Sequence, residues 1–239
     1  TLPEADGMKD GDVSFADYEW MNNGSPLAAA PDGTVKKSYS LTAKIYSTKN
    51  VQIIRNGEAE GEPYETLNQA ISAAEAGDTL QLISPAKEVN ITANVTIGKD
   101  LAIDMNGCTV VGTKTITLDK GATLTLRGTG TIQGTVNIGA SSSRYGHLVL
   151  EGNVAFNKEI QVYGQSKNPS SVTVGAHVDS LSVSIGKYAD FTVESGASVN
   201  TLNLSLGKTG SSPYNVIANI NGPVDQLTLS QTASKGTSQ

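Results

Sequence analysis

The chain has 239 residues and a formal net charge of −6, with 38% apolar and only 17% charged residues. The low charge content argues against intrinsic disorder, the acidic balance argues against a nucleic-acid partner, and a single cysteine excludes an intrachain disulfide framework. No apolar run approaches the ~20 residues that a transmembrane helix needs, so no membrane insertion is expected. The abundance of small polar residues and glycine is typical of an all-β protein with many short strands.

Residues 1–60 are predicted to form an N-terminal loop and hairpin cap, or the remnant of a preceding module. Residues 39–45 alternate apolar and polar side chains, which indicates a half-buried strand. A second strand at Val51–Ile54 follows after a short turn and ends at Asn56-Gly57. The two strands predict a small β-hairpin.

One helix is predicted, at residues 66–76. Its apolar stripe has the spacing of a single helix face and consists of Leu67, Ala70, Ile71 and Ala74. Thr66 and Gln69 have the spacing of a capping box, and Gly77 follows where a C-terminal glycine is expected. Because only strands follow, this helix is expected to cover the open end of a stacked β structure.

An internal repeat of aliphatic residues runs from about residue 80 to the end, with a period of roughly 19 to 25 residues. The first column is Ile97, Leu118, Ile138, Val162, Ile185, Leu206 and Leu229. The second column is Leu82, Ile103, Leu126, Leu150, Val174, Val193 and Val216. The third column is Val89, Val110, Ile132, Val154, Val178, Val199 and Val224.

Three short strands per repeat describe a prism of three parallel sheets. Residues 61–239 are therefore predicted to form a parallel β-helix of about seven three-strand coils, each stacked on the last at ~4.8 Å. The strong bias of parallel crossovers predicts that the helix is right-handed.

Three segments carry a resemblance to a known group: residues 64–80, residues 101–107 (LAIDMNG) and residues 122–128 (ATLTLRG). They resemble the opening coils of the pectate-lyase-like superfamily of single-stranded right-handed β-helices. In that superfamily such openings occur on bacterial secreted and cell-surface proteins, both adhesin-like repeat proteins and polysaccharide-degrading enzymes. The resemblance implies the fold and a secreted or cell-surface location, and it leaves the function open.

Enzymes of that superfamily carry clustered carboxylates on one outer face. Here the outward residues of the first column are all neutral: Thr96, Thr117, Asn137, Gln161, Ser184, Ser205 and Thr228. In the second column Glu151 and Glu194 are expected two coils apart, ~9.6 Å, near the upper limit for an inverting glycosidase pair. His147 and His177 are expected in different sheets, so no metal site or other cofactor is assigned. We expect a non-catalytic module, with a polysaccharide lyase or glycoside hydrolase that uses such carboxylates as the alternative.

A basic residue recurs in the turn after each first-column strand. The set is Lys99, Lys120, Arg144, Lys167, Lys187, Lys208 and Lys235, and three of the turns also carry Tyr145, Tyr188 or Tyr214. Lysines pair with uronate or sulfate groups, and tyrosine rings stack on sugar faces. The hypothesis is an edge that binds an acidic polysaccharide or a cell-surface glycan. The alternative interpretation is a row of solvated turns in which a Gly-Lys pair suits the backbone.

Overall fold

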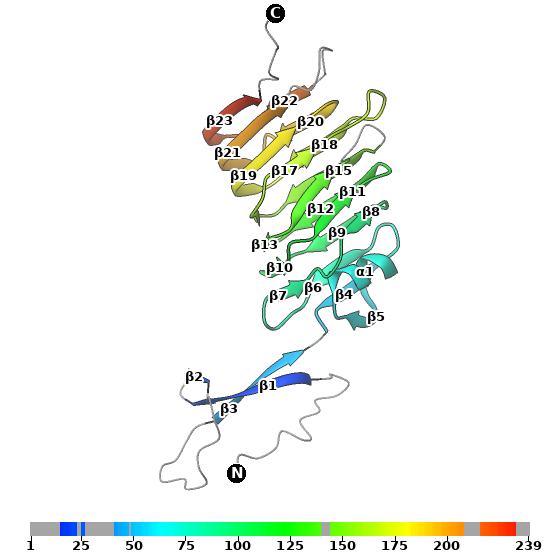
Figure 1. The fold of residues 1–239 in the computed structure, drawn as a ribbon, viewed down its shortest axis with the longest axis vertical. Coiled ribbons are helices and arrows are strands. Elements are labelled where there is room, and N and C mark those ends of the chain that lie inside the picture. The colour runs from blue at the N-terminus through cyan, green and yellow to red at the C-terminus, as the bar shows by residue number, and fades with distance from the viewer. Residues whose placement is uncertain are drawn as a thin grey trace, which may run out of the picture.

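The computed structural model describes residues 15–22, 25–26, 41–47, 49–139, 144–207 and 216–232. From Val51 onward these residues form a parallel β-solenoid of about six turns, which confirms the predicted all-β fold class (Figure 1). The sequence pattern predicts about seven coils. The structure contains one helix in the described residues, and no helix there is long and apolar enough to cross a membrane.

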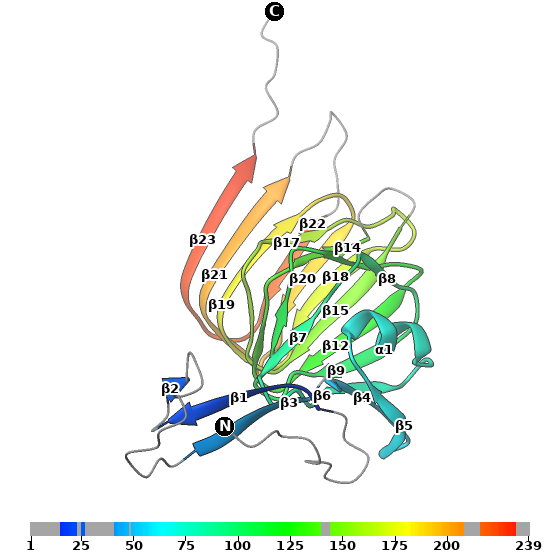
Figure 2. The same cartoon turned by 60° about the horizontal axis from the view of Figure 1, so that its bottom comes forward.

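Three sheets form the sides of the solenoid, and their coils lie over one another around a common interior (Figure 2). The nine-stranded sheet has the order β22 (Val216–Ile220), β20 (Ala189–Val193), β18 (Ser170–Val174), β15 (Gly146–Glu151), β12 (Ala122–Arg127), β9 (Leu101–Asp104), β6 (Thr79–Leu82), β4 (Val51–Arg55) and β5 (Glu58–Tyr64). The seven-stranded sheet has the order β23 (Val224–Thr232), β21 (Ser198–Gly207), β19 (His177–Ile185), β17 (Ile160–Val162), β14 (Thr135–Ile138), β11 (Thr115–Leu118) and β8 (Val95–Ile97). The four-stranded sheet has the order β16 (Val154–Phe156), β13 (Gly130–Ile132), β10 (Thr109–Val111) and β7 (Glu88–Asn90).

The coils near the C-terminal end have two long strands rather than the predicted three short ones. In the earlier coils Gly112 and Gly134 lie between the four-stranded and seven-stranded sheets, and Gly112 has a φ of 129°. Glycine tolerates the tight corner that this position requires. In β19 the corresponding corner lies at Asp179 and Ser180, and there the strand runs through without a break.

The predicted register holds in the middle of the stack and slips at its ends. The first column pairs as expected from Ile97 to Leu206, but Leu229 lies opposite Leu204 instead of Leu206. The same slip moves Thr228 from the outward row of Ser205 to that of Asn203.

The other two columns contain slips of the same kind. Leu80, not Leu82, lies opposite Ile103, and Ile220, not Val216, lies opposite Val193. In the third column the partner of Ile132 is Phe156, while Val154 lies opposite Gly130. Every slip is an even number of residues, so the misplaced residues keep the expected side of the sheet.

The helix α1 (Leu67–Ala73) closes the N-terminal end of the core, as predicted. Its capping box is present: the Thr66 side chain accepts from the Gln69 amide, and the Gln69 side chain accepts from the Thr66 amide. The predicted apolar stripe is buried in the core. The helix ends three residues earlier than predicted, at a C-cap on Ala74, and Gly77 follows in a turn with a φ of 92°.

The predicted pairing of residues 39–45 with 51–54 is wrong. β4 instead forms a hairpin with β5 and also pairs antiparallel with β6. Asn56 and Gly57 have φ values of 54° and 86°, the left-handed pair that a two-residue type I′ hairpin turn requires. β3 (Leu41–Ser47) pairs with β1 (Phe15–Asn22), and β1 also pairs with β2 (Ser25–Pro26). The predicted division of the chain into two parts at residue 60 stays a prediction.

An ion pair joins the hairpin to the first parallel strand. Arg55 donates two hydrogen bonds to Asp78, at 2.9 and 2.8 Å, and the Asp78 side chain is only 3% exposed. The Glu75 amide donates a further bond of 2.7 Å to the same carboxylate. The Arg55 hydrogen bonds are the main reason why the pKa of Asp78 lies below its ordinary value.

The column assignment is tested by placing a charge inside and outside the stack. Val178 is fully buried, so Val178→Asp places an unpaired charge in the core and is expected to cost about 3 kcal/mol or more in the free energy of unfolding. Thr117 lies on the outer face between Thr96 and Asn137, so Thr117→Asp is expected to cost under about 1 kcal/mol. Urea unfolding of both variants measures the difference, and equal losses would contradict the assignment.

The Arg55–Asp78 pair is expected to make stability depend on pH. A carboxyl group whose pKa is lowered by folding stabilises the protein above its unfolded pKa, and this contribution is lost as the pH falls through the folded value. The stability difference between the native chain and Asp78→Asn should therefore be constant at neutral pH and shrink below about pH 3.8. Unfolding curves between about pH 7 and pH 2 measure it, with Glu88→Gln as the exposed control. A difference that stays constant to the lowest pH would contradict this role.

Candidate functional site

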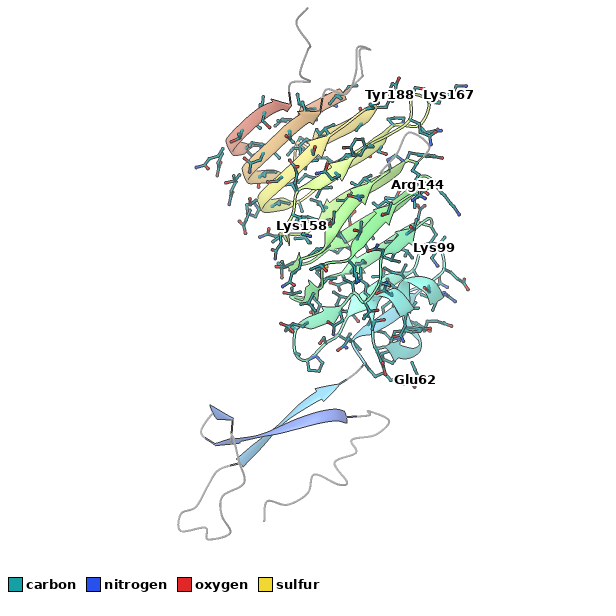
Figure 3. The ribbon with its side chains drawn as sticks, in the orientation of Figure 1. Glu62, Lys99, Arg144, Lys158, Lys167 and Tyr188 are labelled. Carbon is teal, nitrogen blue, oxygen red and sulfur yellow. The ribbon has the colours of Figure 1, made fainter. Side chains whose placement is uncertain are left out.

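Five of the predicted basic residues lie where strands of the seven-stranded sheet end and strands of the nine-stranded sheet begin. We call the described members Lys99, Lys120, Arg144, Lys167 and Lys187 the basic edge. Figure 3 shows three of them, Lys99, Arg144 and Lys167, along one side of the solenoid with Tyr188, whereas Lys158 lies on the opposite side. The other predicted members of the row, Lys208, Lys235 and Tyr214, lie outside the described residues.

Backbone hydrogen bonds continue from coil to coil through these turns. The Gly121 amide donates to the Tyr145 carbonyl at 2.9 Å, and the Gly164 amide donates to the Lys187 carbonyl at 2.8 Å. The fully buried Ser170 hydroxyl bridges two turns, because it donates to the Tyr163 carbonyl and accepts from the Gly146 amide. The side chains of the basic edge are therefore presented from an ordered stack of turns.

Two of the five basic residues are not fully exposed to solvent. Lys99 is half-buried, and its ammonium group donates to the carbonyl of Ala74, the C-cap of α1. Lys99 thus completes the end of the capping helix, where a cation is also favoured by the helix dipole. Lys187 is half-buried as well.

The other three cations are exposed and lie in three consecutive coils. Lys120 has a φ of 58°, and its aliphatic chain lies over Gly98 of the preceding coil, where an added Cβ would lie 3.2 Å from Cδ. The guanidinium group of Arg144 lies 3.5 Å from the Asp119 carboxylate, so part of its charge is already compensated. Lys167 follows one coil later in the longer turn 163–169.

Two tyrosine rings pack on glycines of a neighbouring turn. A Cβ at Gly121 would lie 2.7 Å from the ring of Tyr145, and a Cβ at Gly186 would lie 2.4 Å from the ring of Tyr163. Both tyrosines are half-buried residues. The sequence analysis does not single out Tyr163 as a site residue, because Tyr163 directly follows the core residue Val162. It lies in the same turn as Lys167 of the basic edge.

His147 adds a second aromatic group beside Tyr145. The two rings are 6.4 Å apart and meet edge to face at 76°. The His147 ring shares a hydrogen bond of 2.9 Å with the Ser171 hydroxyl. Partial burial lowers the pKa of His147, and the nearby carboxylates of Asp100 and Asp190 oppose that shift. The neutral imidazole is therefore the favoured form beside the basic edge at neutral pH.

The carboxylates of the catalytic alternative lie on the outer face of the nine-stranded sheet. The registers place Glu151, Gly175 and Glu194 in successive coils, which agrees with the expected two-coil separation of the glutamates. Glu151 accepts a 2.8 Å hydrogen bond from Arg127 in the preceding coil. The Glu151 carboxylate is therefore already engaged by a neighbouring side chain of the same face.

The two histidines lie in different sheets, as expected, and His177 belongs to a polar row on β19. Its ring contacts the Ser198 hydroxyl at 2.8 Å and the Asp179 carboxylate at 3.1 Å. The pKa of Asp179 lies below its ordinary value, mainly because of a hydrogen bond from Asn153 and next because of one from His177. The Ser-His-Asp order resembles a nucleophile relay, but the side chains of His177 and Asp179 are 49% and 66% exposed. Such groups are solvated by water and lack the preorganised, water-excluded surroundings on which a relay depends.

An open cleft of about 830 Å³ lies beside α1, at the capped end of the solenoid near Glu62 (Figure 3). Several of its polar groups are already bonded within the protein. The Asn68 side chain donates to the Ala93 carbonyl and accepts from the Thr92 amide, both at 2.8 Å. In the described parts of the chain, the cleft included, no three His, Cys, Asp or Glu side chains are grouped to hold a metal ion.

No protein-family model, curated protein or solved structure matches this chain. The side chains on the solenoid surface are therefore the grounds on which a function can be proposed.

Proposed function

We propose that this chain is a non-catalytic β-solenoid module that binds an acidic polysaccharide along the basic edge. The observation that carries the proposal is the alignment of Lys120, Arg144 and Lys167, three exposed cations in consecutive coils of an acidic protein. The turns that present them are joined by backbone hydrogen bonds. A ligand that repeats an anionic group along its length is the chemical class that fits such a row.

The spacing of the cations suits a polymer. Consecutive coils are ~4.8 Å apart, so neighbouring basic groups lie roughly 5 to 10 Å apart when the side chains extend. Carboxylates of uronic acids or sulfate groups of a glycan recur on a similar scale. Each exposed ion pair contributes only ~0 to 1 kcal/mol, so the affinity must come from several contacts to one chain.

The tyrosine rings supply the second part of the proposed site. Tyr145 and Tyr163 lie in the same stack of turns as the cations, with their rings held against glycines. An aromatic ring can pack against the apolar face of a sugar, an interaction that does not depend on charge. The edge thereby combines recognition of the anionic groups with recognition of the sugar ring.

A non-catalytic role is supported by the Arg127–Glu151 ion pair and by the neutral outward row of the first column, which runs from Thr96 to Ser205. The resemblance of residues 64–80 to the opening of pectate-lyase-like β-helices supports a secreted or cell-surface, adhesin-like or carbohydrate-associated protein. The superfamily that this segment resembles also contains polysaccharide-degrading enzymes, so lyase or hydrolase activity is the competing proposal. That activity would require Glu151 or Glu194 to act on a bound polysaccharide.

Neutralising the exposed cations is expected to abolish binding. The triple variant Lys120→Gln, Arg144→Gln, Lys167→Gln should weaken binding to polygalacturonate and dextran sulfate by at least about tenfold, while neutral dextran binds neither protein. Affinity electrophoresis or calorimetry measures the change. Binding of the native chain should also decrease with added salt and with shortening of the polygalacturonate.

A matched control is available on other surfaces of the solenoid. The triple variant Lys87→Gln, Lys114→Gln, Lys158→Gln changes the net charge by the same amount, and Lys158 lies on the side opposite the basic edge (Figure 3). It should bind like the native chain. Equal loss in both variants, or no binding by the native chain, would reject the basic edge. Release of reducing or unsaturated ends that Glu151→Gln abolishes would support the enzyme instead.

The contribution of stacking can be separated from that of charge by salt. Tyr145→Leu keeps an apolar side chain against Gly121 but removes the aromatic face, so binding should weaken about fivefold or more. This loss should be the same at low and high ionic strength, because salt screens only the ion pairs. If Tyr145→Leu binds like the native chain at both salt concentrations, the ring takes no part in recognition.

A further inference from the structure

An outward row of the nine-stranded sheet runs alongside the basic edge, with one residue in each coil. The strand registers and a hydrogen bond from the Thr123 amide to the Asp100 carboxylate set its order, which is Asp100, Thr123, His147, Ser171 and Asp190. His147 follows Arg144 by only three residues, where β15 begins. Arg144 lies on the side of the solenoid that carries the basic edge (Figure 3). His147 is therefore the histidine that adjoins the proposed ligand path.

The His147 ring is held in place by two contacts. It meets the Tyr145 ring edge to face, with 6.4 Å between the ring centres. Its Nδ1 atom lies 2.9 Å from the Ser171 hydroxyl in the next coil. Within the described parts of the chain, its Nε2 atom has no hydrogen-bond partner, and the residue is half-buried. One ring nitrogen is thus fixed by the protein, and the other is left to bind an oxygen atom of a ligand.

The groups around His147 leave its ring neutral at neutral pH. Its neighbours on the adjacent strands, Thr123 and Ser171, carry no charge. The carboxylates of Asp100 and Asp190 lie two coils away on either side, ~9.6 Å along the stack. Partial burial lowers the pKa of His147 below the ordinary 6.5, and these two carboxylates oppose the shift. A further negative charge close to the ring would favour the imidazolium form.

A bound polyanion would change this balance in one direction. The nearest cations along the basic edge are Arg144, in the turn before β15, and Lys120, in the turn before β12. Both disfavour a second positive charge on His147, and an anionic group bound to them removes that repulsion. A carboxylate or sulfate group beside Arg144 also attracts the proton directly. As imidazolium, the ring donates from both nitrogens.

We propose that His147 is a further ligand-binding residue of the basic edge, which as imidazolium donates from Nε2 to an anionic group of the polysaccharide. Binding then takes up a proton from solution. The affinity rises as the solution becomes more acidic, because ligand binding and protonation favour each other. The inference rests on the proposed function of the basic edge. It makes the edge a site that binds acidic polysaccharides more tightly in mildly acidic surroundings.

The range from about pH 7.5 to about pH 5 isolates this effect. Histidine is the side chain whose ordinary pKa falls in that range, and the chain has two histidines. The second, His177, lies on β19 of the seven-stranded sheet. The sulfate groups of dextran sulfate stay ionised throughout, so a change in affinity with pH comes from the protein.

Calorimetric titration with dextran sulfate at about pH 7.5 and about pH 5 tests the proposal. The native chain should bind about threefold or more tightly at the lower pH, the effect of one exposed ion pair. His147→Gln keeps a polar side chain beside Ser171 but cannot gain a charge, so it should lose most of this difference. His177→Gln makes the same substitution away from the edge and should keep the native pH dependence. Thermal unfolding shows whether both variants remain folded.

An NMR titration of the native chain gives a second readout that does not depend on a variant. The pKa of His147 should rise by at least about 0.5 when dextran sulfate binds, the shift that corresponds to a threefold change in affinity, while the pKa of His177 should not move. If the native chain binds but His147→Gln retains its full pH dependence, or the ligand leaves the pKa of His147 unchanged, the inference is wrong and the basic edge stands. No binding at either pH would reject both.

Discussion

The structure depends on one constraint: each inward side chain must have a like neighbour in the coil before it and in the coil after it. Leu126 and Leu150 satisfy the constraint within the stack and are completely buried. A single coil has no interior of its own, so burial arises only between coils. At the N-terminal end the missing neighbour is supplied by α1 and by a hairpin that the Arg55–Asp78 pair holds in place.

The same constraint aligns the surface. Because backbone hydrogen bonds run from turn to turn, a residue type that recurs in the turns becomes a row on the outside. This explains how an acidic protein can carry Lys120, Arg144 and Lys167 on consecutive coils of one edge. It also explains the ion pair between Arg127 and Glu151, which lie directly opposite each other in adjacent strands. A stacked repeat thus arranges side chains in space through sequence spacing alone.

Much of the fold could be predicted because burial on parallel strands leaves a periodic pattern. The errors also have a physical cause: Leu229 and Leu204 are shifted by two residues from the predicted pairing, and a shift of two preserves the inward and outward sides. The hydrophobic pattern therefore fixes the side of a residue better than its partner. The spacing of the turns in the sequence predicts where the basic-edge residues lie along the solenoid. It does not predict which groups their side chains contact. The bond from Lys99 to Ala74 depends on where a helix 25 residues earlier ends, which no spacing reveals.

The capped N-terminal end also has a consequence for how the chain reaches this structure. Each coil contacts mainly the one before it, at a separation of roughly 20 to 25 residues, so every new coil closes a loop of similar, moderate entropy cost. The capped N-terminal end supplies the first ordered apolar surface against which a new coil can pack. Folding can then proceed as templated growth from α1 toward β23, in the order in which a ribosome delivers the coils. In this scheme β23 orders after the other described strands of the solenoid and frays before them.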